Sequence, residues 1–350
     1  MTDRVVAPAA AGGGAVPETT VPPAQPSQPS RSAMAGGVAQ RILFRYGLVV
    51  AYILMLIIFS ALKPHVFPTA ENLRAVLEEC APTGIMAVGL TAVLIMNDFD
   101  LSFASMLGLG SGLVTILIVN HHIGWVLAVI ICLLVGVAGG VFNGFLIAVL
   151  GGSSFIITLA MGTVLTGVEF AVTGEKDIFS GYSNGFLGVA QHNSLLGLNN
   201  QVWIALVIAI LAWVMLEKTE VGRFMYAIGG NSEAARLAGV RVKSLRILGF
   251  VLIAMAAVAA GVLITSLGGS YTPDPGPSYL LPAYAAAFLG AAAFRPGQFN
   301  ILGTIVGVLF LETVITGLTM LDLSTWIINV VQGAILIVAI LLSRLGEKMA

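Results

Sequence analysis

Long apolar runs, separated by short polar segments, fill most of the chain between residues 46 and 343. A helix that crosses a bilayer needs about 20 mainly apolar residues, and about 10 segments approach that length. The pattern therefore predicts an all-α fold, a polytopic transmembrane helical bundle. The expected spans are residues 46–62, 80–96, 102–119, 124–150, 155–172, 202–216, 247–267, 280–294, 299–320 and 325–343.

Two pairs of neighbouring spans are separated by only a few polar residues. Residues 97–100 (Asn-Asp-Phe-Asp) divide the second span from the third, and residues 295–298 (Arg-Pro-Gly-Gln) divide the eighth from the ninth. Interrupted helices at matching positions in two halves are typical of transporters, where they mark the binding site. We expect an internal repeat with the pathway between the halves. Both pairs point the same way, so an inverted repeat is not inferred.

Composition supports a membrane protein. Hydrophobic residues make up 58% of the chain and charged residues only 9%, against about 25% charged in a soluble domain. The net charge of −1 and the lack of a basic stripe argue against a nucleic-acid partner. Cys80 and Cys132 lie in apolar runs without disulfide or metal-site spacing, so no metal is expected.

The first 40 residues differ in composition from the rest. Residues 1–40 are mostly Ala, Gly, Pro, Ser and Thr, and such a segment cannot offset the entropy lost on ordering. We expect a disordered cytoplasmic N-terminal tail over 1–40 and a transmembrane domain over 41–350. The N-terminus lacks the pattern of a cleavable signal peptide.

Basic residues are concentrated in one loop. Residues 217–246 hold six of the 16 Lys and Arg residues, whereas the 173–201 loop holds only Lys176. The positive-inside rule then places the 217–246 loop and both termini in the cytoplasm. Six spans before this loop and four after it satisfy the rule, as expected for a multi-pass protein of the bacterial inner membrane.

The basic loop also predicts a short helix. Asn231 or Ser232 can cap its N-terminus, Glu233 suits its first turn, and Gly239 can end it. A helix this short is not stable alone, so a groove in a soluble partner would suit it. The alternative is a solvated loop that only fixes topology.

The same segment resembles a known motif. Glu233-Ala234-Ala235 followed by Gly239 has the EAA-x-x-x-G form of the coupling motif in ATP-binding-cassette (ABC) import permeases. The run VGRFMYAIGGNSEAARLAGV resembles the same loop of the ribose, xylose and arabinose permease family. Residues 100–102 resemble its Asp-Leu-Ser segment, and residues 143–146 and 155–159 resemble its Asn-Gly and Phe-Ile-x-Thr-Leu stretches.

The resemblance implies the permease subunit of a sugar importer. It implies cytoplasmic ATP-binding subunits, a periplasmic or lipid-anchored solute-binding protein, and a second permease chain, identical or different. The chain has no G-x-x-x-x-G-K-[ST] phosphate loop, so no cofactor is expected here, and ATP and Mg belong to the partner ATPase. The expected ATPase-coupling residues are Gly222, Arg223, Asn231, Glu233, Ala234, Ala235, Arg236 and Gly239.

Both interruptions depart from the family pattern. Asn97 and Asp98 replace paired glycines, and Arg295 and Pro296 replace small residues. These positions would line a pathway, so the departures weaken the assignment to pentoses. The expected substrate-pathway residues are Asn97, Asp98, Asp100, Ser102, Asn143, Phe155, Thr158, Glu169, Tyr284 and Glu312.

Carboxylates within apolar segments are costly in lipid and therefore informative. Asp98 and Asp100 have no cation beside them in the sequence. They can accept hydrogen bonds from sugar hydroxyls, or cap the helix that begins near Leu101. Glu169 and Glu312 are expected to face the bundle interior and bond to polar neighbours.

Two other transporter classes stay open on the sequence. An ion-coupled secondary transporter would use these carboxylates as coupling sites, and a branched-chain amino acid permease of the ABC type shares the general plan. An enzyme is not expected, because no catalytic constellation lies within the spans. The polar segments 173–201 and 268–279 are candidate docking surfaces for a binding protein.

Overall fold

A computed structural model describes residue 2, residues 31–295 and residues 297–347. The chain divides into two units, Met1–Gln40 and Arg41–Ala350, and the account below concerns the second. The predicted disordered tail falls largely on residues 3–30, which lie outside the described residues. The first helix begins at Arg31, within the range expected to be tail.

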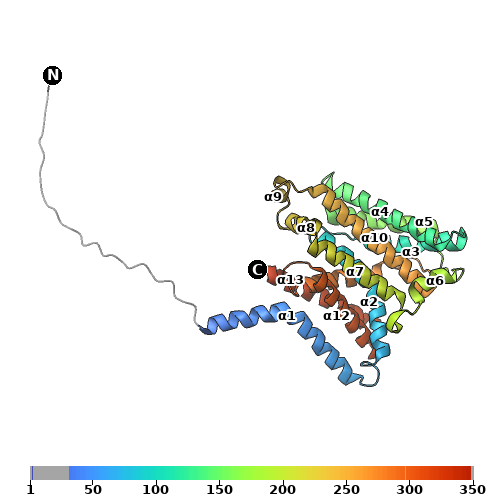
Figure 1. Ribbon diagram of the computed structural model, residues 1–350, viewed down its shortest axis with the longest axis horizontal. Helices are drawn as coiled ribbons and strands as arrows, with labels where there is room; N and C mark the ends of the chain where they lie inside the picture. The colour runs from blue at the N-terminus through green and yellow to red at the C-terminus, as the bar shows by residue number, and fades with distance from the viewer. Residues whose placement is uncertain (1, 3–30, 296, 348–350) are drawn as a thin grey trace. The chain divides into compact units, whose positions relative to one another are not determined.

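The described chain is a succession of α-helices (Figure 1). In chain order they are α1 Arg31–Leu62, α2 Ala70–Leu94, α3 Phe103–Thr115 with a π-helical turn Ile116–Asn120, α4 Trp125–Ala148, α5 Ser154–Thr173, α6 Asn184–Gln191, a 3-10 turn Leu195–Gly197, α7 Asn200–Lys218, α8 Glu220–Gly230, α9 Ser232–Leu237, α10 Val242–Gly268, α11 Pro277–Ala291, α12 Ile301–Met320 and α13 Thr325–Glu347.

The predicted polytopic helical bundle is confirmed. Among the described residues, eight helices are long and apolar enough to cross a membrane. The two remaining predicted spans correspond to a shorter apolar stretch, Gly47–Leu62, and to the 15-residue α11. The second span begins earlier than expected, at Ala70 with Thr69 as its N-cap. The first turns of α2 include the charged residues Glu71 and Arg74, so they lie outside the apolar run from which the span was predicted.

Helices α2, α3, α10 and α12 form the buried centre of the bundle. Figure 1 shows α4 and α10 side by side, and α10 also contacts α2 and α3. α11 packs against α2, α12 and α13. α2 and α3 are mostly buried, whereas α4, α5, α7 and α13 expose apolar faces suited to lipid. The α2–α3 and α11–α12 interruptions lie where these buried helices end, and Asn97 and Arg295 in them are exposed.

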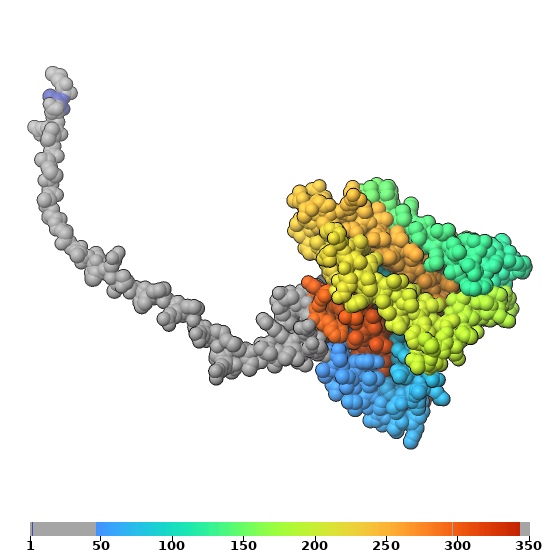
Figure 2. Space-filling model, in the orientation of Figure 1, coloured from blue at the N-terminus to red at the C-terminus, as the bar shows by residue number. Residues whose placement is uncertain are grey.

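Contacts between loops sort them to two ends of the bundle. Residues 95–102 and 292–300 contact α8 at one end, through bonds from Asn97 to Gly229 and from Tyr226 to Phe299. We call this end, which holds the 217–246 loop, the basic end. At the opposite end, Ile178 pairs with Tyr271 in an isolated β-bridge, which joins the loops after α5 and α10. Figure 2 shows α8 and α9 as a yellow to gold surface region.

Candidate functional site

The short helix predicted in the basic loop is present as α9. Asn231 caps it, because its side-chain oxygen accepts a hydrogen bond from the Ala234 N–H at 2.9 Å. Gly239, with φ of +88°, ends it in a left-handed conformation that favours glycine. Ala235 is buried, whereas Leu237 is 76% exposed. α9 therefore presents an outward surface that the rest of the described chain leaves uncovered.

The charged residues of α9 pair with each other on that surface. Arg236 Nε donates to Glu233 Oε2 at 3.0 Å, and both side chains are exposed. The Arg236 guanidinium lowers the pKa of the Glu233 carboxyl below its usual value. Glu233 is therefore ionised at neutral pH and available to a partner. An exposed pair of this kind adds little to the stability of the fold. Its two residues are therefore better suited to contact a partner than to hold α9 in place.

A further helix, α8, which the apolar pattern did not predict, precedes α9. α8 carries the predicted coupling residues Gly222 and Arg223. Gly222 lies so close to the Leu216 carbonyl that any side chain there would collide with it. Met225 and Ile228 are buried beside Gly222, a spacing of three residues that marks one face of a helix. That spacing was the signal available in the sequence.

The first interruption is held by an ion pair across the fold. Arg246, at the start of α10, donates to both carboxylate oxygens of Asp98 at 2.7 and 2.5 Å. The Asp98 side chain is only 4% exposed and that of Arg246 26%. The sequence showed no cation beside Asp98, and the fold supplies one from 148 residues away. Asn97, with φ of +59°, bonds to the Gly229 carbonyl at 2.6 Å.

A buried polar network continues from this interruption. Asp100 Oδ1 accepts hydrogen bonds from Ser102 N at 2.8 Å and from Ser102 Oγ at 2.6 Å, and thus stabilises the start of α3. Asn143 Nδ2 donates to Ser102 Oγ at 2.8 Å. Thr158 Oγ1 accepts from Leu101 N at 3.0 Å. The structure thus brings four predicted pathway residues together, and Asp100 has the capping geometry.

A cavity of about 690 Å³ opens beside this network. Four predicted pathway residues, Asn97, Asp98, Phe155 and Tyr284, line it. Aromatic rings cross it in a row, from Phe99 to Tyr284 and Phe288 with centroids 6.4 Å apart at each step, then to Phe299 at 5.1 Å. The other lining residues are Leu94, Leu101, Leu280, Leu281, Leu336, Ile340 and Ser343.

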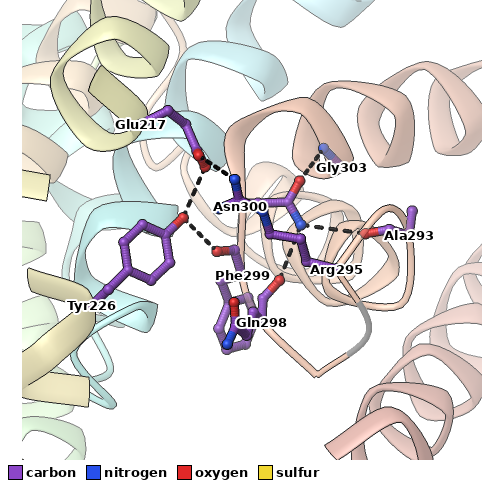
Figure 3. Close-up of polar contacts among 8 residues, drawn as sticks. All are labelled: Glu217, Tyr226, Ala293, Arg295, Gln298, Phe299, Asn300 and Gly303. Atoms are coloured by element: carbon purple, nitrogen blue, oxygen red, sulfur yellow. Dashed lines mark hydrogen bonds and ion pairs between the residues drawn. The ribbon is translucent and has the colours of Figure 1, made fainter. Parts of the chain in front are cut away.

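The second interruption is also linked to the basic loop by polar contacts (Figure 3). Arg295 contacts Glu217, at the end of α7, at 2.8 Å. The Tyr226 hydroxyl lies 3.0 Å from both Glu217 Oε1 and the Phe299 carbonyl, so it can donate to either. Burial raises the pKa of Tyr226, so it stays a donor. Arg295, which was expected at a pathway position, binds Glu217 and is not among the lining residues of the cavity.

Asn300 starts the helix after this interruption. Its side-chain oxygen accepts from Gly303 N at 2.7 Å, and its Nδ2 donates to the Gln298 carbonyl at 3.0 Å (Figure 3). A second Nδ2 contact, of 3.3 Å, reaches the Ala293 carbonyl. Asn300 therefore holds the turn closed while it caps α12.

The structure places the two remaining predicted carboxylates away from this cavity. Glu169 accepts bonds from the Tyr271 hydroxyl at 2.8 Å and from Asp274 N at 2.9 Å. It thereby ties α5 to the loop after α10 at the opposite end. Glu312 is buried on α12. Neither residue belongs to the cavity lining.

A polytopic bundle with two interrupted helix pairs beside one cavity is an arrangement typical of membrane transport proteins. A family model described as "Branched-chain amino acid transport system / permease component" matches residues 72–340. The chain belongs to this family.

Three curated relatives resemble the chain over most of its length. The ribose import permease protein RbsC of Escherichia coli (strain K12) is 33% identical over 85% of this chain and 92% of its own. The L-arabinose transport system permease protein AraH of the same strain is 32% identical over 88% and 93%. The D-allose transport system permease protein AlsC, also of that strain, is 30% identical over 87% and 93%. No solved structure matches the chain significantly.

Proposed function

We propose that this chain is the permease subunit of an ABC importer that carries a sugar or related small polyhydroxylated solute across the bacterial inner membrane. Membership of the permease family and the sugar names of three relatives support the assignment. ATP is hydrolysed on a separate cytoplasmic subunit. A solute-binding protein delivers the solute at the opposite end, and a second permease chain completes the pore.

The exposed surface of α9 is the observation that carries this proposal. A six-residue helix is not stable by itself, yet this one is capped at its N-terminus by Asn231 and ended by Gly239. Glu233, Arg236 and Leu237 face outward from it. An outward pair of charges beside an apolar side chain suits a groove on the ATPase.

Charge reversal on α9 tests the proposal. Glu233→Lys should reduce ATPase co-purification and ATP-driven uptake at least tenfold, while membrane insertion is unchanged. The measurements are affinity purification from gently solubilised membranes with mass spectrometry, and uptake of labelled D-ribose, D-allose and L-arabinose into right-side-out or reconstituted vesicles that hold ATP inside. Glu71→Lys is the matched control, because Glu71 is exposed and lies at the opposite end. Unchanged uptake in Glu233→Lys would remove the coupling role of α9.

The same vesicles separate the two rival functions. The family model takes its description from branched-chain amino acid transport, so ATP-driven uptake of L-leucine in place of sugars would favour that group. Uptake that collapses with an uncoupler at constant ATP would indicate ion coupling. Arg246 already neutralises Asp98, and Asp100 caps α3, which leaves fewer carboxylates for that role.

The opposite end supplies a surface for the binding protein. The segment between α5 and α7 includes α6 and is pinned to the α10–α11 loop by the Ile178–Tyr271 bridge. Phe179, Leu195 and Leu196 are well exposed on this segment, although they lie outside the candidate membrane spans. Exposed apolar side chains rimmed by polar ones favour a protein contact.

A further inference from the structure

The first and last residues of the basic loop each form an ion pair with a different interruption. Glu217, where α7 ends, pairs with Arg295 in the second interruption at 2.8 Å. Arg246, near the start of α10, pairs with Asp98 in the first interruption at 2.5 Å. We call residues 217–246, with α8 and α9, the bracket. One continuous segment therefore reaches both interrupted helix pairs.

Each interruption has a second contact with the bracket. Asn97 Nδ2 donates to the Gly229 carbonyl at 2.6 Å, and Gly229 is so close to the Ile95 carbonyl that a side chain cannot fit there. The Tyr226 hydroxyl lies 3.0 Å from the Phe299 carbonyl. Gly229 and Tyr226 both belong to α8. The helix just before α9 is therefore bonded to both interruptions.

The two interruptions also meet across the cavity. Phe99 and Leu101 from the first and Phe299 from the second line the same 690 Å³ space. A separate cavity of about 460 Å³ lies on the bracket side, and Gly229, Gly230, Asn231 and Ser232 are among its lining residues. Asp98 lines both cavities. The Asp98–Arg246 pair thus stands between α9 and the aromatic cavity.

The pairing geometry suits transmission of movement. A guanidinium that donates to both oxygens of a carboxylate fixes distance and orientation together. Separating Asp98 from Arg246 would leave a nearly buried charge without a partner, which is strongly unfavourable. A displacement of Arg246 therefore moves Asp98 with it more readily than it breaks the pair. The Glu217–Arg295 pair links the other interruption to the bracket by a single contact of 2.8 Å with a half-exposed Arg295. Tyr226 lies beside this pair, 3.0 Å from both Glu217 Oε1 and the Phe299 carbonyl.

We propose that the bracket, through Asp98–Arg246 and Glu217–Arg295, moves both interruptions together, so that a displacement of α9 changes the aromatic cavity in one step. These four residues are positioning residues, and the proposal rests on the proposed function of the chain. It gives Arg295 a role, which is to bond the second interruption to the ATPase-facing loop.

A cysteine reporter in the cavity tests the proposal without knowledge of the solute. Leu281 lines the cavity from α11 and is half exposed, so Leu281→Cys can report on access. The permease–ATPase complex is labelled with a small membrane-impermeant maleimide, with and without ATP and vanadate. We expect the labelling rate to change at least fivefold with nucleotide. The same complex without Leu281→Cys is the background control, since Cys80 and Cys132 are buried.

Variants of the bracket pairs should abolish that change. Arg246→Gln and Arg295→Gln should each keep the ATPase bound but reduce the nucleotide effect to less than twofold. The charge-swapped double variant Asp98→Arg with Arg246→Asp should restore at least half of it. Lys243→Gln, an exposed neighbour in the bracket, is the matched control. Arg295→Gln keeps the test decisive if a variant at Asp98 does not fold, because Arg295 is half exposed.

The outcomes distinguish the two proposals. A nucleotide effect retained in both Arg246→Gln and Arg295→Gln would overturn the bracket while leaving the importer assignment intact. No nucleotide effect in the complex with an unaltered bracket would overturn the importer assignment itself. Loss of the effect in Lys243→Gln as well would show a general sensitivity of the loop to charge, and would also count against the bracket.

Discussion

Glycines on one face of α4 set how closely that helix approaches α10. Gly136, Gly140 and Gly144 are spaced four residues apart, and each faces α10. A Cβ added at Gly140 would lie 2.5 Å from the Cα of Val251, and one at Gly144 would lie 2.6 Å from the Cα of Ile247. Small residues at this spacing let membrane helices pack backbone to backbone. The close approach therefore fixes the position of α10, which carries Arg246, against α4.

Gly140→Ala should therefore destabilise the bundle. The added methyl meets backbone atoms, which cannot rotate away, and overpacking of this kind costs about 1–3 kcal/mol. The expected result is a lower unfolding temperature of the detergent-purified chain. Gly139→Ala is the control, because its methyl meets only the flexible end of the Met106 side chain and gains about 1 kcal/mol of helix propensity. Equal effects of the two substitutions would contradict the backbone argument.

The two aspartates of the first interruption show how far single residues could be interpreted from the sequence. Capping by Asp100 could be predicted, because its partner Ser102 lies two residues away and local spacing is visible in the chain. The pairing of Asp98 could not, because Arg246 lies 148 residues away. The same holds for Arg295, whose partner Glu217 lies in another helix. Local bonds were predictable, and tertiary ion pairs required the fold.

At the scale of the helix, α9 depends on its cap. Asn231→Ala removes the bond to Ala234 N, and loss of an N-cap costs about 1 kcal/mol. A six-residue helix has little other support, so its backbone amides should exchange at least fivefold faster. Hydrogen exchange of residues 232–237, followed by mass spectrometry, measures this. Asn231→Ser should restore most of the protection, since serine also caps; equal exchange in both variants would show that packing of Ala235 holds α9 instead.

Helices could be predicted from the sequence where one kind of residue pattern was enough to specify them. Long apolar runs predicted the spans, and cap and stop residues predicted α9. α8 was missed because its buried face, formed by Gly222, Met225 and Ile228, is interleaved with charged and polar residues. The start of α2 was missed because its first turns are charged and partly exposed. The length of an apolar run therefore predicts helix boundaries poorly at the ends of spans, where the segments are amphipathic.

At the scale of the whole molecule, the polar interactions described above gather at the two ends of the bundle. The basic end gathers the two ion pairs of the bracket and both interruptions. The opposite end gathers Glu169, Tyr271 and the Ile178–Tyr271 bridge. The proposed transport cycle needs this separation, because the proposed ATPase and binding protein would act from opposite sides of the membrane. The order of the spans was predictable, and so was the shared side of the 173–201 and 268–279 segments, which the Ile178–Tyr271 bridge joins. The ion pairs that join the basic loop to the two interruptions were not.

The side of the membrane that each end faces is the remaining prediction. The 217–246 loop carries six of the 16 basic residues, and translocating a basic loop is unfavourable, so the basic end should face the cytoplasm. Lys243→Cys and Lys176→Cys replace exposed residues at the two ends. A membrane-impermeant maleimide should label Lys176→Cys from the periplasmic side and Lys243→Cys only in inverted vesicles, with low background because Cys80 and Cys132 are buried. Labelling of Lys243→Cys from the periplasmic side would place α9 out of reach of a cytoplasmic ATPase, and the coupling role of the bracket would be lost with it.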